Sequence, residues 1–333
     1  MRRILIAAAL LALVAGCNRP QAALPTATAT PGAAPIPTSS PTPAASRMIL
    51  VAPTMAGDAA GAALFAQAQA ALEELAVAAE MEFSTLEALP DDEAAGVALL
   101  VALPPDPGLQ PWAETHTAVQ TVSLGIAGLQ PASNLSAIAP DGIRYDQLGF
   151  ALGYLAAMVT PEYRVGAVVL DASVANLALA RGFVAGGTYY CGLCRPVHPP
   201  YVEYPAYLEG RPANLAAEGL STLLVAPQPQ SLTDLGLPAN SEVALVGVGE
   251  PASDLAPSWI ASGDFDVAAA LEAAWALAQS EQGGTTIPLG IRFHLVNTSV
   301  VSEGRLALAE ALLADISAGL IDTGVDPLTG ELR

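Results

Sequence analysis

The stretch IRYDQLGFALGYLAAMVTPEYRVGAVVLDASVANLALARGFVAGG, residues 143–187, decides the fold. Apolar residues surround the predicted helix at 148–158, which indicates that this helix is buried on most sides. The pair Thr160-Pro161 ends it, because the residue before a proline is pushed out of the helical region. The short apolar run 165–170 then predicts a strand that is covered on both faces.

A polar segment and a second helix follow this strand. Residues 171–176 leave the strand at its carboxyl end, where open α/β sheets bind their ligands. The second helix is predicted to end at Gly186 and Gly187, since glycine often terminates helices. The stretch is therefore one α/β unit with a polar loop at the ligand-binding edge of its sheet.

The same alternation of strand and helix runs through the rest of the chain from residue 48. Further strands are predicted at 48–53, 81–88, 96–103, 117–126, 134–139, 200–204, 221–226, 242–248 and 287–296, and helices at 62–79, 212–219, 264–279 and 304–321, with a short helix opened by Asp91 and Asp92. Regular alternation favours parallel sheets with right-handed crossovers. Two such sheets are the economical arrangement, and one large doubly wound sheet is the alternative.

The charge composition excludes several classes of function. The chain has 12 basic and 32 acidic residues and a formal net charge of −20. Every basic residue is arginine, so a Schiff-base lysine and a phosphate-loop lysine are both excluded. Nucleic-acid binding depends on cationic contacts to phosphate, and the acidic balance argues against a nucleic-acid partner.

The first residues are typical of a secretory signal. Arg2 and Arg3 precede an apolar core at 4–14, which is too short to span a bilayer because a span needs about 20 residues. The end of the segment, Val14-Ala15-Gly16-Cys17, resembles the lipobox of bacterial lipoproteins. That resemblance implies cleavage after residue 16 and a lipid on Cys17, which would anchor the protein on the extracytoplasmic side of a bacterial membrane. The alternative is an ordinary signal peptide with a chance cysteine.

Residues 17–47 contain the candidate lipidated cysteine and a Pro/Thr/Ala-rich stretch. Such a composition cannot bury enough apolar surface to fold, so this stretch is expected to be a disordered tether.

Several passages of the globular part resemble the basic membrane protein family, which comprises lipoprotein solute receptors of ABC importers. The passages are Asp146-Gln147 with Phe150, Gly153 and 154–157, then 165–169 with 180–186, then 246–248 with 259–262, and finally 317–321. They occur in the family's order and cover most of residues 144–321.

The resemblance implies the type I periplasmic-binding-protein fold. This is an α/β fold of two Rossmann-like lobes with parallel sheets, which are joined by a three-crossing hinge and close on a ligand. The crossings are expected near 140–145, 249–258 and 283–288. The first lobe then comprises 48–143 and about 250–285, and the second lobe comprises 144–249 and about 286–333.

The residues that nucleoside receptors of this family use are absent or displaced. Those receptors carry Asp-x-Ser-Phe-Asn after the first strand, and here only Asp58 corresponds. Their Gly-Val-Asp loop is Gly247-Val248-Gly249-Glu250 in this chain, and their lysine after the serine is missing. A purine nucleoside remains one candidate ligand among small polar molecules.

The candidate pocket residues follow the carboxyl ends of predicted strands or lie near the hinge. They are Thr54, Met55, Asp58, Tyr145, Asp171, Asn176, Phe183 and Glu250. Six of them have a structural alternative. The three residues Asp58, Asp171 and Asn176 have the side chains that cap helices, the two aromatic rings can be packing residues, and Glu250 can be a solvated loop acid.

Cys191 and Cys194 are expected to form a local disulfide in an oxidising compartment. A redox-active pair is the first alternative, although the usual thioredoxin-like setting is absent. A metal site with His198 is the second, and it lacks an evident fourth ligand.

The sequence favours a binding protein over an enzyme. It contains no Gly-x-Ser-x-Gly elbow, no zinc-protease helix and no phosphate loop, and no cofactor is expected. We expect a membrane-tethered protein that captures a small ligand and delivers it to the permease of an ABC importer. The alternatives are a sensor or scaffold lipoprotein of the same fold and, third, an envelope α/β enzyme.

Overall fold

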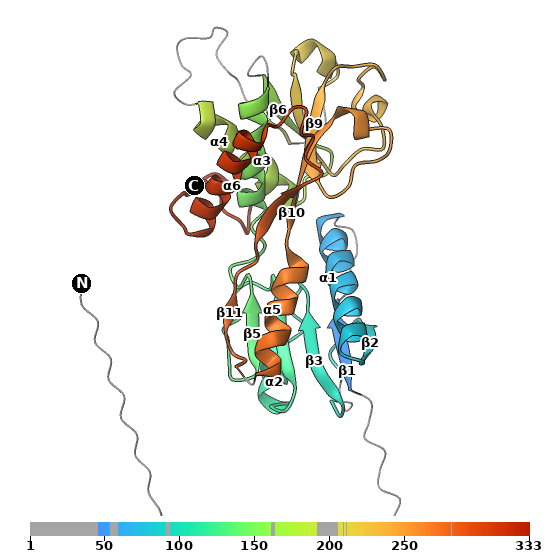
Figure 1. Ribbon diagram of the computed structural model, residues 1–333, viewed down its shortest axis with the longest axis vertical. Coiled ribbons are helices and arrows are strands. Elements are labelled where there is room, and N and C mark those ends of the chain that lie inside the picture. The colour runs from blue at the N-terminus through green and yellow to red at the C-terminus, as the bar shows by residue number, and fades with distance from the viewer. Residues whose placement is uncertain are drawn as a thin grey trace, which may run out of the picture. The chain divides into compact units, whose positions relative to one another are not determined.

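Two six-stranded sheets, each flanked by helices, form the two lobes of the computed structural model (Figure 1). The structure describes residues 46–53, 59–90, 94–160, 164–191, 206–208, 210, 212–280 and 282–333. Both lobes belong to one compact unit, Ala44–Arg333.

The sheet of the first lobe has the order β11-β5-β4-β3-β1-β2, and all its strands are parallel. Its strands are β1 (Arg47–Val51), β2 (Glu82–Leu86), β3 (Val97–Ala102), β4 (Gln120–Leu124), β5 (Leu135–Ile138) and β11 (Thr286–Ile287). The helices α1 (Ala59–Ala78) and α5 (Val267–Gln279) contribute to one buried apolar cluster with this sheet, and α2 (Leu109–Thr115) contributes to another. The lobe is therefore a three-layer α/β structure.

The sheet of the second lobe has the equivalent order β12-β10-β9-β8-β6-β7. Its strands are β6 (Val165–Val169), β7 (Ala206–Tyr207), β8 (Thr222–Ala226), β9 (Ala244–Val248), β10 (Trp259–Phe265) and β12 (Ile291–His294), of which β12 is antiparallel to β10. Its helices are α3 (Tyr145–Val159), α4 (Val174–Cys191) and α6 (Glu303–Ser317), with 3₁₀ turns η1 (Leu215–Glu218), η2 (Leu232–Leu235) and η3 (Ala256–Ser258). The shared strand order confirms the prediction of two Rossmann-like lobes with parallel-dominated sheets.

The chain passes between the lobes three times. The first crossing, residues 139–144, joins β5 to α3, the second lies between Phe265 and the helix cap Asp266, and the third occupies residues 288–290 between β11 and β12. The second crossing had been expected at 249–258, with the first lobe resuming near residue 250, and this is wrong. Strand β10 is buried along its whole length and lies parallel to β9, so the preceding loop stays within the second lobe.

Other predicted elements differ from the structure at their ends. The predicted strand 287–296 is split into β11 and β12, because Pro288 cannot donate to a ladder. The last helix ends at Ser317 before the left-handed Gly319, the predicted helix 212–219 is only the turn η1, and α2 was not predicted. The short helix opened by Asp91 and Asp92 and the strand 200–204 fall on residues outside the described part.

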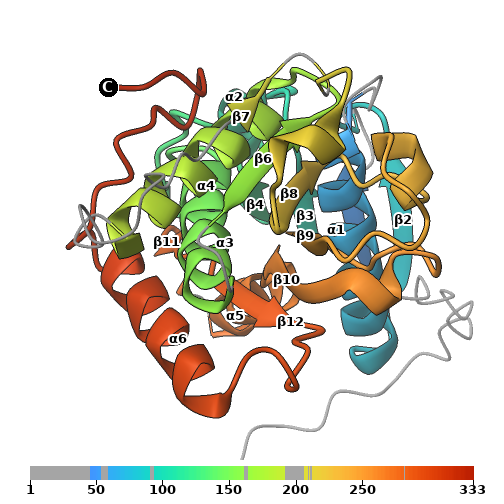
Figure 2. The ribbon, with the colours of Figure 1, turned by 90° about the horizontal axis from the view of Figure 1, so that it is seen from above.

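The helices α3 and α4 pack backbone to backbone. They lie next to each other in the view from above (Figure 2). Four glycines line the contact, two from each helix, and a Cβ on any of them would overlap a backbone carbonyl of the opposite helix. The pairs are Gly149 with Leu179, Gly153 with Phe183, Gly182 with Asp146, and Gly186 with Phe150. Only residues without a side chain permit this approach.

This contact explains why α4 does not end at Gly186 and Gly187, as had been predicted. The helix continues to Cys191, and neither glycine adopts a positive φ. The glycine pair therefore includes a packing residue instead of a helix terminator. Phe183 is fully buried in the same region, and such burial of an aromatic ring stabilises the fold by about 1.5–3 kcal/mol.

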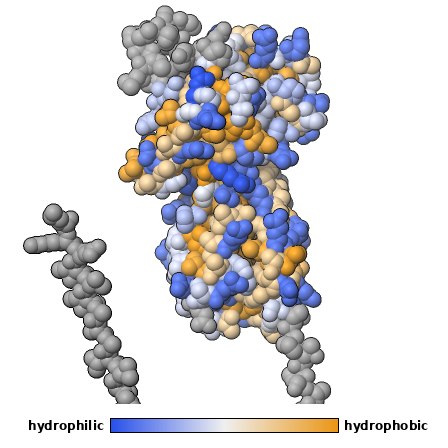
Figure 3. Space-filling view, viewed as in Figure 1, coloured by the Kyte–Doolittle hydropathy of each residue, from blue (hydrophilic) through white to orange (hydrophobic). Residues whose placement is uncertain are grey.

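Apolar side chains also remain exposed on the second lobe. Leu308 of α6 and the C-terminal residues Leu320, Leu328 and Leu332 are among the exposed large hydrophobic residues. Hydrophobic surface gathers on this side of the upper lobe in the space-filling view (Figure 3). None of the described helices is both long and apolar enough to span a bilayer.

The α3–α4 contact predicts that replacing one of its glycines by alanine destabilises the protein, although alanine is normally the better helix former. Gly153→Ala should lower the free energy of unfolding by at least about 2 kcal/mol, because the added methyl forces the helices apart. The matched control is Gly304→Ala, in the first turn of α6, where nothing lies within 4 Å of an added Cβ. It should be neutral or stabilise by up to about 1 kcal/mol, as expected for an open helical position. Urea denaturation of both variants checks this, and equal effects would contradict it.

Candidate functional site

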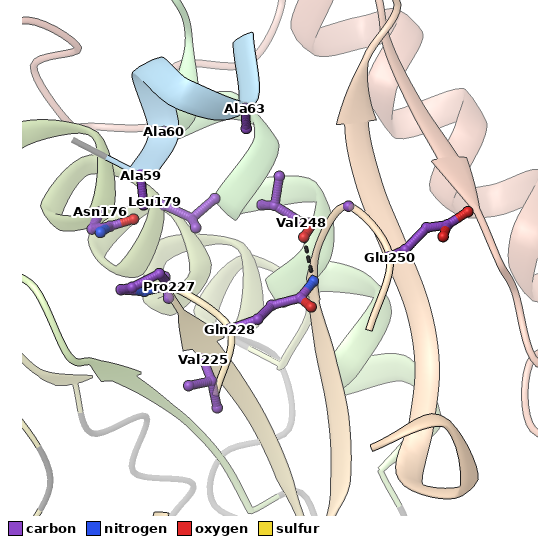
Figure 4. A pocket seen from close by; sticks show the side chains of 12 residues that line it. Ala59, Ala60, Ala63, Asn176, Leu179, Val225, Pro227, Gln228, Val248 and Glu250 are labelled. Atoms are coloured by element: carbon purple, nitrogen blue, oxygen red, sulfur yellow. Dashed lines mark hydrogen bonds between the residues drawn. The ribbon is translucent and has the colours of Figure 1, made fainter. Parts of the chain in front are cut away.

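A cavity of about 280 Å³ lies between the two lobes (Figure 4). The first lobe contributes the start of α1, and the second contributes the carboxyl ends of β8 and β9 with the first turns of α4. The lining residues are Ala59, Ala60, Ala63, Asn176, Leu179, Val225, Ala226, Pro227, Gln228, Val248, Gly249 and Glu250. Carboxyl ends of parallel strands are where open α/β sheets bind ligands, so this cavity is the candidate ligand site.

Asn176 is positioned by the loop between β6 and α4. Its backbone N–H donates to Ser173 Oγ at 3.4 Å, and its Nδ2 donates to the Asp171 backbone oxygen at 3.2 Å. The side chain is 6% exposed. This amide is therefore held in one orientation at the wall of the cavity.

The loop after β9 forms the opposite part of the second lobe's wall. Gln228 Nε2 donates to the Val248 backbone oxygen, and Ser262 Oγ donates to the Gly249 backbone oxygen at 2.6 Å. Trp259 Nε1 in turn donates to Ser262 Oγ at 2.9 Å. Three buried or half-buried side chains thus fix the backbone that carries Glu250 to the rim of the cavity.

The structure brings together only part of the predicted site. Asn176 and Glu250 line the cavity, whereas Asp171 does not and accepts a hydrogen bond from the Ser173 backbone N–H at 2.8 Å. Its role is the structural alternative, organising the start of α4. Phe183 is fully buried in the core, so the prediction that its ring contacts a ligand is wrong.

Tyr145 lies at the hinge and joins the lobes. Its hydroxyl donates to the Ala60 backbone oxygen at 3.4 Å, and its ring meets the ring of Phe265 edge-on with centroids 5.1 Å apart. Tyr145 is not among the lining residues of the cavity. In this conformation its ring packs against Phe265.

A second polar contact between the lobes lies near the hinge. Gln67 Nε2 of α1 donates to Asp264 Oδ1 of β10 at 2.6 Å, and the same oxygen accepts from the Phe265 backbone N–H at 3.0 Å. Asp264 is 8% exposed. The buried carboxylate therefore has two donors, one from each lobe.

Several predicted residues lie outside the described part of the chain. They are Thr54, Met55, Asp58, Cys17 and Cys194, together with the side chain of Cys191. Sequence reasoning missed Gln228 and the alanines of α1. Gln228 is the second residue after the strand β8, and this position near a strand end was the available signal.

A larger cavity of about 670 Å³ borders all three crossings at the hinge. Arg144 is one of its lining residues and forms two hydrogen bonds with the fully buried Asp146, Nε to Oδ1 and Nη2 to Oδ2, both at 2.8 Å. The hydrogen bond to Asp146 raises the pKa of Arg144, against the opposing effect of burial. Thr323 Oγ1 also donates to Asp146 Oδ2 at 2.6 Å, which ties the C-terminal segment to the start of α3.

Comparison with solved structures shows the fold. A solute-binding protein of an ABC transporter system from Aeropyrum pernix K1 is similar with a TM-score of 0.54 and 12% identity, over 84% of this chain and 92% of that one. The topology and this likeness together show the type I periplasmic-binding-protein fold that the sequence predicted.

Two other solved structures are similar to a lesser degree. They are a Caulobacter myo-inositol binding protein bound to myo-inositol (TM-score 0.47, 12% identity, 80% and 96% covered) and a LacI family transcriptional regulator from Enterococcus faecium with bound ribose (0.46, 10%, 75% and 96%). No protein-family model matches the sequence, and no curated protein matches it significantly. Membership of the basic membrane protein family therefore stays a prediction.

Proposed function

We propose that this protein is a membrane-tethered solute receptor that captures a small polar molecule between its lobes and delivers it to an ABC importer. The observation that carries the proposal is the cavity at the strand ends, with walls from both lobes. Contacts that form only when both walls meet a ligand favour the closed conformation, so binding and closure are coupled. The mechanism requires no chemical step, and we propose no enzymatic activity and no cofactor.

The proposed anchor and location rest on the N-terminal sequence. A signal segment at 1–16, a lipidated Cys17 and a tether to residue 47 would hold the binding unit outside the cytoplasmic membrane. The alternative is a sensor or scaffold of the same fold without a transporter. If a permease and an ATPase were encoded beside this protein, that would favour transport.

The ligand is a small polar solute, and a nucleoside is one narrower form of the proposal. Nucleoside receptors of the basic membrane protein family motivate it, although this chain lacks most of their recognition residues. The described part of the cavity wall also contains no aromatic ring to stack on a base. Adenosine is therefore included in the ligand screen as the test of this narrower form.

A thermal-shift screen against nucleosides, sugars, amines and amino acids tests capture directly, since a bound solute raises the melting temperature. A solute present at about 100 times its Kd stabilises by about 2.7 kcal/mol. Ala63 is exposed and lines the cavity. Ala63→Trp should therefore abolish that shift, because the indole ring would fill the space that the solute needs. Its neighbour Ala62, also exposed but outside the lining, gives the control Ala62→Trp, which should keep the shift. No shift with any solute would refute the receptor function.

Lipidation has its own test. Cys17→Ser should abolish incorporation of a labelled fatty acid in cells and leave the signal segment uncleaved, because the thiol is the attachment point. The control Cys191→Ser should be labelled like the natural protein. Mass spectrometry of the N-terminal peptide checks the cleavage. A labelled Cys17→Ser variant would show that Cys17 is not the lipid attachment site.

A further inference from the structure

Two amide side chains of the cavity wall, Asn176 and Gln228, have an oxygen that makes no hydrogen bond with another described residue. Asn176 Nδ2 donates to the backbone oxygen of Asp171, and its Oδ1 takes part in no hydrogen bond with another described residue. Figure 4 shows this oxygen on the side of the other lining residues. Asn176 is 6% exposed, and its oxygen can accept a hydrogen bond from a ligand or water in the cavity.

Gln228 repeats the arrangement on the opposite part of the wall. Its Nε2 donates to the Val248 backbone oxygen (Figure 4), and its Oε1 makes no hydrogen bond with another described residue. The orientation of each amide follows from its backbone partner, because a carbonyl oxygen accepts only from the NH₂ group. Both amides therefore present oxygen to a bound molecule.

The charges around the cavity point the same way. None of the residues in the described lining is cationic, and Glu250 at the rim is exposed with no ion pair among the described residues. The start of α1 contributes the positive end of a helix dipole, about half an elementary charge, which is smaller than the full negative charge of Glu250. An anion would lose its hydration here without gaining a cationic partner.

We propose that the solute carries a cationic nitrogen with N–H donors, as in an aliphatic amine or amino sugar. This inference rests on the proposed receptor function and names its ligand class. The N–H groups donate to Asn176 Oδ1 and Gln228 Oε1, and the carboxylate of Glu250 stabilises the positive charge. The acidic net charge of the whole chain, −20, also attracts cations to the protein.

Two matched series of probes test the class. Putrescine, 1,4-butanediol and succinate share four carbons and differ in charge, and D-glucosamine, D-glucose and D-glucuronate share one ring. Titration calorimetry on the mature protein should show the cationic member binding at least about tenfold more tightly than the neutral member in one series or both. The anionic members should bind most weakly. The proposed ligand class is overturned if succinate or D-glucuronate binds most tightly, or if the neutral member of each series binds as tightly as the cationic one.

A charge variant separates the role of Glu250 from general attraction. Glu250→Gln keeps the shape and should weaken binding of the preferred amine by about three- to tenfold, without changing the affinity of the neutral probe. The control Glu242→Gln makes the same change at an exposed residue of the same lobe outside the cavity lining, and it should bind like the natural protein. Equal weakening in both variants, or in neither, contradicts a local ion pair.

The outcomes also distinguish this inference from the receptor function. A neutral or anionic solute that binds and loses affinity in Ala63→Trp leaves the receptor function intact and refutes only the cationic class. If neither these probes nor any solute of the wider screen binds, both are refuted.

Discussion

The close approach of α3 and α4 is the constraint on which the second lobe depends. Four glycines let the two backbones touch, and this contact sets the position of each helix along the other. The helix α3 follows the first crossing from the other lobe, and α4 carries Asn176 in its first turn. A shift of one helix against the other would therefore displace both the hinge and the wall of the cavity. Cores are close-packed, so the backbone has little freedom to absorb such a shift.

The two lobes contribute walls of different character to the cavity. In the second lobe, backbone carbonyls are held by Asn176, Gln228 and Ser262, so the groups that meet a solute are organised before it arrives. The first lobe contributes the small side chains at the start of α1. This lobe is connected to the second lobe by the three chain crossings. The direct contacts between the lobes include the hydrogen bond from Gln67 to Asp264. This arrangement suits a receptor whose lobes move about a hinge while one wall keeps its geometry.

The sequence was sufficient for the fold and for part of the site. Alternating apolar strands and helices predicted two parallel-dominated sheets, since periodicity directly reflects burial. Asn176 was predicted because it follows a strand and Glu250 because it was placed at a hinge crossing, and both line the cavity. The second crossing was misplaced because a loop with Gly249 and Pro251 has the local signals of a connection whether or not the chain changes lobe. Gly186 was mistaken for a helix end, because a glycine's role in packing depends on a partner helix more than 30 residues away in the sequence. Phe183 was likewise a core residue that sequence position alone does not distinguish from a pocket residue.

The central claim is that both lobes engage one solute. Hydrogen–deuterium exchange of the full protein, with and without the solute that most raises its melting temperature, measures this most directly because it reports each wall separately. The account predicts that exchange slows together in residues 59–63 of α1 and residues 225–250 of the second lobe. Protection confined to one of these segments, or to neither, would contradict capture between the lobes.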